Sequence, residues 1–241
     1  MNKIYVVGTD TGVGKTVLSL LLMQFFLERG RRPFYLKPLQ TGCATPRDKD
    51  SDAGFVYKHV ESLRDKDPSE SVVYCFRNPK APYFAARDEG REIDMKLVDK
   101  VVEEKSRRYS PLILEAAGGL LAPVAERKLM ADTIGPGTRV LVAARAGLGT
   151  INHTLLSIEA LERRGIRPAA VVFLDAAETP PDLVAENIEA VRKYSGIKVS
   201  GVIGRINDFS RPPQDCYRPL EFLFPAGAPL RNRSQGSGVR D

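Results

Sequence analysis

The chain has 241 residues, of which 43% are apolar, so it can bury a full hydrophobic core and its length suits one large domain. Its formal net charge is +6, but Lys and Arg are spread along the chain without a block of five like charges, which argues against direct binding of nucleic acid. The three cysteines lie far apart in the sequence and predict neither a disulfide framework nor a zinc site, as expected in a reducing cytoplasm.

No segment predicts a membrane span or an export signal. The apolar run at residues 17–27 contains Ser19 and Gln24 and is shorter than the roughly 20 residues that a span requires. No cationic region with a cleavage site precedes the first apolar run, so we expect no signal peptide. A cytoplasmic protein without membrane contact is expected.

Short apolar runs alternate with helical patterns along the chain. Branched apolar residues, typical of buried strands, gather at residues 4–7, 34–36, 112–114, 140–143, 171–174 and 199–203. Helical spacing of apolar residues covers residues 16–29, 93–107, 152–164 and 180–194. This alternation predicts an α/β fold with a doubly wound, mostly parallel sheet flanked by helices. We expect one domain over residues 1–225 and a mobile C-terminal tail over residues 226–241.

Polar segments and glycines mark the boundaries of these elements. Residues 43–67 predict a long loop with a short helix over the sheet, near the strand ends where ligands bind in such folds. Thr179 predicts the N-cap of the last helix because prolines and an acidic residue follow it. Gly165 and Gly196 predict the C-terminal ends of two helices.

A glycine-rich segment links the first predicted strand to the first predicted helix. Residues 8–16 are Gly-Thr-Asp-Thr-Gly-Val-Gly-Lys-Thr, and the order of strand, loop and helix indicates a phosphate-binding loop. Its backbone N–H groups are expected to bind the phosphates of ATP at Thr9, Asp10, Gly12, Val13 and Gly14. Lys15 should reach the β and γ phosphates, and Thr16 should offer its hydroxyl to Mg²⁺. This context disfavours the alternative, a glycine-rich turn that binds nothing.

A lysine stands directly after the second predicted strand. Lys37 and Pro38 follow residues 34–36, so Lys37 should reach the sheet edge that holds the phosphates, with Thr41 close behind. An ammonium group there can neutralise the charge of a transferring phosphoryl group. Taken alone, Lys37 would be interpreted as a solvated surface lysine, and its place beside the phosphate loop favours the site.

Two carboxylates could complete a magnesium shell. Glu115 ends an otherwise apolar strand, where a carboxylate is costly unless it is paired or holds a metal. Asp52 lies in the predicted loop over the sheet, and a loop aspartate is usually only solvated. A hard cation prefers oxygen ligands, so both residues are candidates together with Thr16.

A further helix begins just after the strand at residues 140–143. The N–H groups of Gly149, Thr150, Ile151 and Asn152 could form an anion site suited to a carboxylate. Alternatively the segment is a plain helix start, capped by the side chains of Thr150 and Asn152. The spacing does not choose between the two.

The order and spacing of these motifs resemble the dethiobiotin synthetases. The matching segments span roughly residues 1–205 and comprise residues 8–16, 37–41, 51–53, 115–119 and 149–153. The resemblance implies a homodimer with a parallel sheet of about seven strands and two sites at the subunit interface. It also implies an ATP- and Mg²⁺-dependent ligase that forms dethiobiotin from 7,8-diaminononanoate and CO₂, releasing ADP and phosphate.

The resemblance also assigns roles by position. Lys15 and Lys37 would stabilise phosphoryl transfer, and Thr16, Asp52 and Glu115 would bind Mg²⁺. The diamine or its carbamate would be held by Thr11, a catalytic candidate with the two lysines, and by Thr41 and Gly118. The partner subunit's copy of residues 149–152 would receive the carboxylate of the substrate.

The sequence departs from the family at several positions. Ala116 stands where a glycine is usual after the metal glutamate, and Asn187 where a tyrosine is sometimes found. Asp175 replaces an asparagine that reads adenine, and Gly204 stands where a proline is common. A carboxylate only accepts hydrogen bonds, which suits the two donors of guanine, so we expect a weaker preference for ATP and use of other nucleoside triphosphates.

Two other functions remain open from the sequence. Another ATP-dependent amide-forming ligase of the same fold is one, although such enzymes usually carry a glutaminase domain for which this chain is too short. A nucleotide-switch ATPase acting on a protein partner is the other. Such ATPases carry a signature lysine early in the loop, where this chain has Asp10 and Thr11.

Overall fold

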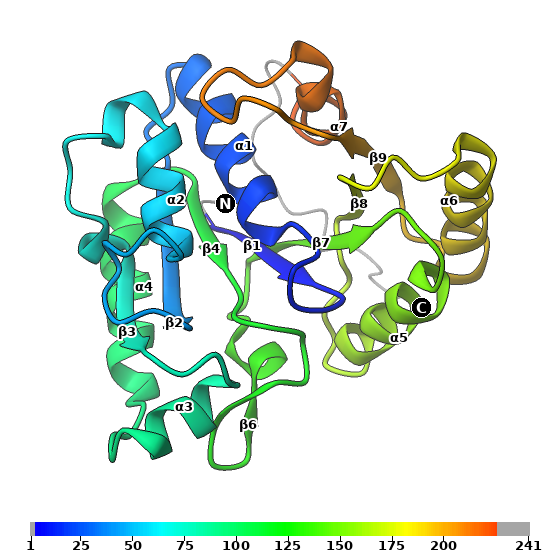
Figure 1. The fold of residues 1–241 in the computed structure, drawn as a ribbon. Helices are drawn as coiled ribbons and strands as arrows, with labels where there is room; N and C mark the ends of the chain where they lie inside the picture. Colours follow the sequence, from blue (N-terminus) through cyan, green and yellow to red (C-terminus); the bar gives the residue numbers. More distant parts are fainter. Residues whose placement is uncertain (1–2, 226–241) are drawn as a thin grey trace, which may run out of the picture.

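The apolar runs of the sequence form one central sheet in the computed structural model, which describes residues 3–225 (Figure 1). Its strands are β1 (Lys3–Gly8), β2 (Phe34–Thr41), β3 (Val72–Phe76), β4 (Leu112–Glu115), β7 (Arg139–Arg145), β8 (Ala170–Asp175) and β9 (Val199–Gly204). They lie in the order β3-β2-β4-β1-β7-β8-β9, and all neighbours are parallel. Two short strands, β5 (Pro123–Ala125) and β6 (Lys128–Leu129), pair antiparallel apart from this sheet. The predicted fold class is confirmed.

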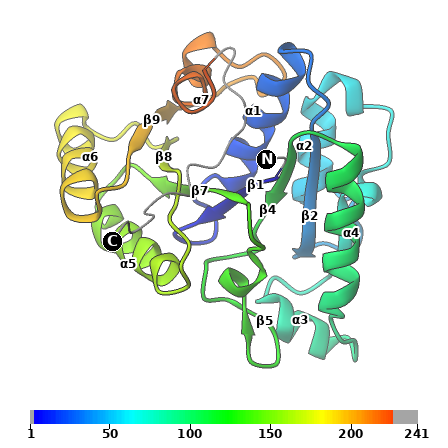
Figure 2. The same cartoon turned by 180° about the vertical axis from the view of Figure 1, so that it is seen from behind.

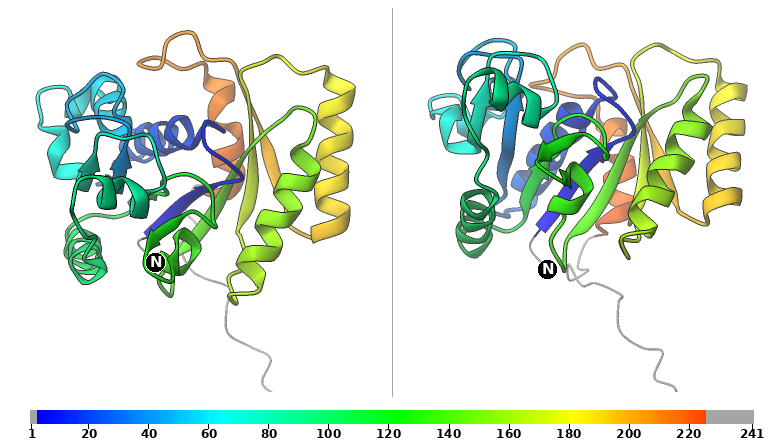
Figure 3. Two further views of the ribbon diagram at one scale, coloured as in Figure 1. Left: turned by 60° about the horizontal axis from the view of Figure 1, so that its bottom comes forward. Right: turned by 90° about the horizontal axis from the view of Figure 1, so that it is seen from below.

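Helices cover both faces of the sheet (Figures 2 and 3). One face carries α1 (Lys15–Glu28), α2 (Asp52–His59) and α7 (Arg218–Leu223). The other carries α4 (Met95–Arg108), α5 (Thr150–Glu162) and α6 (Pro181–Ser195). The short α3 (Pro82–Asp88) packs beside β5.

Two apolar cores result, one on each face of the sheet. Along β1, Ile4 and Val6 join the core under α1, while Tyr5 and Val7 join the core under α4 and α5. Because both faces are covered, the strands are continuous apolar runs without polar alternation. The sheet is therefore packed on both faces at the point where β1 passes into α1.

β2 is longer than predicted. It was expected to end at Leu36 but continues to Thr41, so Lys37 lies within the strand and not after it. The extension exists because β2 pairs with β3 from Lys37 onward, after its pairing with β4 has stopped at Leu36. Pro38, which lacks an N–H group, lies in the part of β2 that has separated from β4.

Other elements differ from the sequence prediction. β3, the β5–β6 pair, α3 and α7 were not predicted, although the apolar run of β3 gave a usable signal. The expected short helix over the sheet is present as α2, with the Ser51 side chain accepting from the Gly54 N–H. The predicted N-cap role of Thr179 is wrong, because α6 begins at Pro181 and the Thr179 hydroxyl donates to Asp175 instead. Gly196 ends α6 with φ 65°, as predicted.

The predicted mobile tail at residues 226–241 lies outside the described residues. Within residues 3–225, no helix has both the length and the apolar character needed to cross a membrane.

Candidate functional site

The phosphate-loop motif forms a tight turn between β1 and α1. Gly12 and Gly14 have φ of 68° and 93°, a region that disfavours residues with a Cβ. A Cβ at Gly14 would also lie 2.6 Å from Leu174 Cγ, so the end of β8 packs directly against the loop. Among the described residues, no side chain caps the start of α1. The N–H groups of the loop and of the first turn are thus presented as an anion site.

Lys15 folds back over this loop. Its ammonium group donates to the Asp10 carbonyl oxygen at 2.7 Å, and the residue is 6% exposed. Burial, followed by the charge of Lys37, lowers the pKa of Lys15 to about 8. Lys15 forms no ion pair with a carboxylate of the part of the chain that the structure describes, so its ammonium group is suited to bind an incoming phosphate.

Four of the predicted residues meet beside the loop. The Thr16 hydroxyl lies 2.7 Å from Asp52 Oδ1 and 2.9 Å from Glu115 Oε1. The Lys37 ammonium group lies 2.5 Å from Asp52 Oδ2 and 2.8 Å from Glu115 Oε1. Segments distant in sequence, at α1, α2, β2 and β4, supply these groups. We call Thr16, Lys37, Asp52 and Glu115 the carboxylate cluster.

Electrostatics favour the charged forms of Lys37 and Asp52. Burial lowers the pKa of Lys37, but the carboxylates of Glu115 and Asp52 outweigh it, so the net shift is upward. Burial raises the pKa of Asp52, but Lys37 and Thr16 outweigh it, so the net shift is downward. Lys37 therefore remains a cation throughout the neutral range.

Two residues that sequence analysis missed support the cluster from β2. The Tyr35 hydroxyl donates to Glu115 Oε2 at 2.9 Å, and Gln40 Oε1 accepts from the Asp52 N–H at 3.2 Å. Burial and then the Glu115 carboxylate raise the pKa of Tyr35 well above its usual value, so it remains a donor. Strand alternation gave a signal for Tyr35, because it lies two residues before Lys37 and so on the same face.

The cluster has the donor set of a hard cation. Three oxygen groups, from Thr16, Asp52 and Glu115, converge on the space that the Lys37 ammonium group contacts. Mg²⁺ is commonly bound through one or two carboxylates together with substrate phosphates. Within residues 3–225 no group of three His, Cys, Asp or Glu side chains could hold a metal. Phosphate oxygens and water would therefore complete the shell around Thr16, Asp52 and Glu115.

A cavity of about 520 Å³ opens between the loop and the carboxylate cluster. Most predicted site residues line it, namely Thr11, Gly12, Gly14, Lys15, Thr16, Lys37, Thr41, Asp52, Glu115 and Gly118. It also contacts Phe55 of α2 and Phe209, which pack edge to face with ring centroids 5.0 Å apart. Its size suits a small ligand or the phosphate half of a nucleotide.

The predicted residues at the start of α5 do not line this cavity. Gly149 occupies the N-cap with φ 87°, and no side chain of residues 3–225 caps the helix, so the interpretation as a helix capped by Thr150 or Asn152 is wrong. The Thr150 hydroxyl lies instead 3.3 Å from that of Thr154. Leu148, just before the helix, is 92% exposed.

Asp175 and Gly204 lie opposite each other at the ends of β8 and β9. Both oxygens of Asp175 are within 3.1 Å of the Thr179 N–H, and Oδ1 also accepts from the Thr179 hydroxyl at 2.8 Å. These hydrogen bonds hold the Asp175 carboxylate in place. Asp175 directly follows Leu174, whose side chain packs against Gly14 of the phosphate loop. Asn187 is buried and donates to the Ala146 carbonyl oxygen at 2.7 Å, so it supports the segment before α5.

Comparisons with known proteins agree with this geometry. A family model described as an AAA domain matches residues 2–213. An ATP-dependent dethiobiotin synthetase of Anaeromyxobacter sp. (strain K) is 41% identical over 179 residues, which is 72% of this chain and 76% of the relative. The chain belongs to the dethiobiotin synthetase family. A further dethiobiotin synthetase, from Chlorobaculum tepidum, is 35% identical over 218 residues, covering 88% of this chain and 91% of the relative.

Solved structures show that the chain shares its fold with other phosphate-loop proteins. The MinC:MinD cell division complex of Aquifex aeolicus gives a TM-score of 0.59 at 17% identity and covers 96% of this chain and 99% of that one. The cell division ATPase MinD of Pyrococcus furiosus gives 0.55 at 14% identity and covers 92% and 97%. At these identities the likeness concerns the fold alone.

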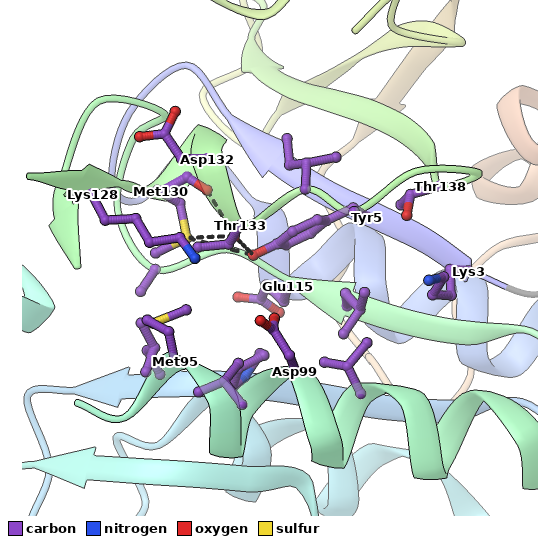
Figure 4. Close-up of a pocket in the computed structure, with 18 of the residues that line it drawn as sticks. Lys3, Tyr5, Met95, Asp99, Glu115, Lys128, Met130, Asp132, Thr133 and Thr138 are labelled. Atoms are coloured by element: carbon purple, nitrogen blue, oxygen red, sulfur yellow. Dashed lines mark hydrogen bonds between the residues drawn. The ribbon is translucent and has the colours of Figure 1, made fainter. Parts of the chain in front are cut away.

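This dethiobiotin synthetase family member has a second cavity, of about 410 Å³, on the opposite face of the sheet (Figure 4). It lies between α4, which supplies Met95 and Asp99, and the segment that holds Lys128 and Thr133. The Tyr5 hydroxyl faces it and lies 2.9 Å from the Thr133 hydroxyl. The phosphate loop does not line this cavity, so we do not assign the nucleotide to it.

Proposed function

We propose that the chain is an ATP-dependent dethiobiotin synthetase that closes the ureido ring of dethiobiotin from 7,8-diaminononanoate and CO₂. The observation that supports this most strongly is the meeting of two lysines and two carboxylates in one cavity at the phosphate loop. The names and sequence identities of the relatives supply the substrate. ADP and phosphate are the other products.

The triphosphate lies in the loop. The backbone N–H groups of residues 9–14 and the uncapped start of α1 bind its oxygens. Lys15 leaves the Asp10 carbonyl and contacts the β and γ phosphates, since a phosphate is a stronger partner for an ammonium group than a carbonyl oxygen. The negative charge of the phosphates then favours the protonated form of Lys15, which burial alone disfavours.

Mg²⁺ is the proposed metal, held by Thr16, Asp52 and Glu115. When bound, it neutralises phosphate charge and orients the γ phosphate. Lys37 is released from part of its contact with the two carboxylates and can then turn toward the transferring group. The short distances within the carboxylate cluster support this role, because they place all four side chains around one point.

The reaction has three bond-forming steps. One amine attacks CO₂ and loses a proton, which gives a carbamate. A carbamate oxygen then attacks the γ phosphorus while the bond to the ADP oxygen breaks. The second amine then attacks the carbonyl carbon of the mixed anhydride, phosphate leaves, and the amine loses a proton. Lys15 and Lys37 stabilise the negative charge that develops on the transferring oxygens. Thr11, Thr41 and Gly118 line the same cavity and hold the diamine.

A second subunit completes the site. We propose a homodimer in which residues 149–152 of one subunit bind the substrate carboxylate in the site of the other. Three features support this: α5 begins without a side-chain cap, Leu148 beside it is exposed, and residues 149–152 do not line the cavity of their own chain. We propose a cytoplasmic enzyme of one domain that acts on small molecules.

The nucleobase lies near Asp175 and Gly204. The pairing of these residues at the ends of β8 and β9 supports this placement, together with the contact of Leu174 with Gly14. Because Asp175 presents only acceptors, we propose weak discrimination against nucleotides whose base offers two donors, such as GTP.

Incubation with the diamine, bicarbonate, Mg²⁺ and ATP or GTP tests the function. Mass spectrometry should detect dethiobiotin, and its formation should be abolished by Lys15→Ala and by Lys37→Ala. A surface variant, Lys80→Ala, serves as the control, because Lys80 lies outside the cavity. Nucleotide hydrolysis that ignores the diamine would favour a nucleotide switch, and activity only with a carboxylic acid and ammonia would favour another amide-forming ligase.

A further inference from the structure

Tyr35 is a buried tyrosine that the proposed reaction does not itself require. It is 1% exposed, lies on β2 opposite Ile113 of β4, and packs in the core under α1. Its hydroxyl reaches the end of β4 and donates to Glu115. The register of β2 and β4 therefore brings a neutral donor to a carboxylate that is 1% exposed.

The two oxygens of Glu115 have different partners. Oε1 points toward the other members of the carboxylate cluster, with the Thr16 hydroxyl at 2.9 Å and the Lys37 ammonium group at 2.8 Å. Oε2 faces the core, where Tyr35 donates to it at 2.9 Å. A buried carboxylate oxygen needs such a donor, and Tyr35 satisfies it without a second cation. Oε1 is thus the Glu115 oxygen that meets the other groups of the cluster, while Oε2 is occupied by Tyr35.

We propose that Tyr35 is a positioning residue that keeps Glu115 a one-oxygen metal ligand and thereby selects Mg²⁺ over larger cations. The proposal rests on the function proposed above, in which Glu115 binds the metal. Mg²⁺ is small, demands octahedral geometry and keeps several waters, so it accepts a single carboxylate oxygen. Ca²⁺ takes more ligands and readily accepts both oxygens of one carboxylate.

Tyr35→Phe removes the donor and keeps the ring. Oε2 then loses its partner and the carboxylate is free to rotate and offer both oxygens. We expect Mg²⁺ to bind roughly tenfold more weakly, as is typical when the hydrogen-bond partner of a metal ligand is lost. Ca²⁺ should lose much less, so the ratio of the two dissociation constants changes in favour of Ca²⁺.

Tyr57→Phe provides a matched control. Tyr57 is also buried, and its hydroxyl lies 2.9 Å from the Ser71 hydroxyl, without a contact to Glu115. Like Tyr35→Phe, Tyr57→Phe removes one tyrosine hydroxyl from the core under α1. Any loss that stems only from a destabilised core should appear in both variants.

Metal binding can be measured without turnover. Mn²⁺ bound with a non-hydrolysable nucleotide analogue is followed by electron paramagnetic resonance and displaced with Mg²⁺ or Ca²⁺. The ratio of the two displacement constants does not depend on the fraction of folded protein, so it stays interpretable if Tyr35→Phe is less stable. A ratio that shifts in Tyr35→Phe and not in Tyr57→Phe is the expected result.

Glu115→Gln separates this proposal from the function. If Glu115→Gln weakens metal binding but the Tyr35→Phe ratio equals that of the unaltered protein, Tyr35 does not select the metal and only this proposal fails. If Glu115→Gln leaves metal binding unchanged, the metal site of the proposed function fails, and the role of Tyr35 fails with it.

Discussion

Replacing Lys37 by methionine tests how much the Lys37 ammonium group stabilises the folded protein by pairing with the two carboxylates of the cluster. Lys37→Met keeps an unbranched side chain one atom shorter than that of lysine and removes its charge. Glu115 is then left fully buried beside Asp52, with no cation between the two carboxylates. Breaking a buried ion pair by removing one partner costs roughly 3–5 kcal/mol. For a chain of this size, that lowers Tm by about 10 °C.

Urea unfolding at pH 7 measures the loss in the free energy of unfolding, and two further variants serve as controls. Lys80→Met breaks the exposed pair with Asp88, which should cost less than about 1 kcal/mol. Adding Glu115→Gln to Lys37→Met removes one of the two uncompensated charges and should recover about half of the loss. The reasoning is refuted if Lys37→Met costs no more than Lys80→Met, or if the double variant recovers nothing.

The pH dependence follows from the direction of the Asp52 shift. Its folded pKa is depressed, so it contributes stability above the unfolded value of 3.8, and this contribution is lost as the pH falls through the folded pKa. Lys37→Met removes the main partner behind that depression. The stability gap between the two proteins should therefore narrow as the pH falls below about 4.

Three further predictions concern the loop and the nucleobase. The pKa of Lys15 is about 8, so about half of its side chains are neutral at pH 8 and nucleotide binding should take up roughly half a proton. Calorimetry in buffers of different ionisation enthalpy measures this uptake, and Lys15→Arg should show none. Gly14→Ala should destabilise by about 2 kcal/mol more than Gly137→Ala, because both residues have positive φ but only Gly14 faces Leu174; equal losses would contradict the contact. Asp175→Asn should raise the ratio of kcat/KM for ATP over GTP by about tenfold, and an unchanged ratio would remove Asp175 from base recognition.

The sequence predicted most of the sheet because its strands are buried on both faces. Continuous apolar runs such as Val140–Leu141–Val142 have no other interpretation once helical patterns lie on either side. The edge strand β3 was missed, and with it the true length of β2. That is why Lys37 was expected after the strand, whereas it lies within it.

The phosphate loop was predictable because its motif is local. The carboxylate cluster was predictable only as a set of candidates, since Asp52 and Glu115 are 63 residues apart and their meeting depends on the packing of α2 over β2. Tyr35 could be placed on the face of Lys37 by strand alternation, but its contact with Glu115 depends on the register between β2 and β4. No sequence pattern records that register.

At Thr179 a clear local pattern predicted a role that the structure contradicts. A threonine followed by two prolines and an aspartate matches a helix N-cap by pattern, but here its hydroxyl and its N–H both bind Asp175 at the end of β8. The hydrogen bonds to Asp175, four residues earlier in the chain, took the place of the expected helix cap. The residue that the sequence assigned to the helix therefore orients the side chain expected to read the nucleobase.

The most direct test of the account is the ratio of phosphate released to dethiobiotin formed in single turnovers with γ-labelled nucleotide. One phosphate per dethiobiotin, with no release when the diamine is absent and none in Lys37→Met, is the predicted result. Phosphate released at the same rate with and without the diamine would contradict a site in which the loop, the lysines and the substrate act together.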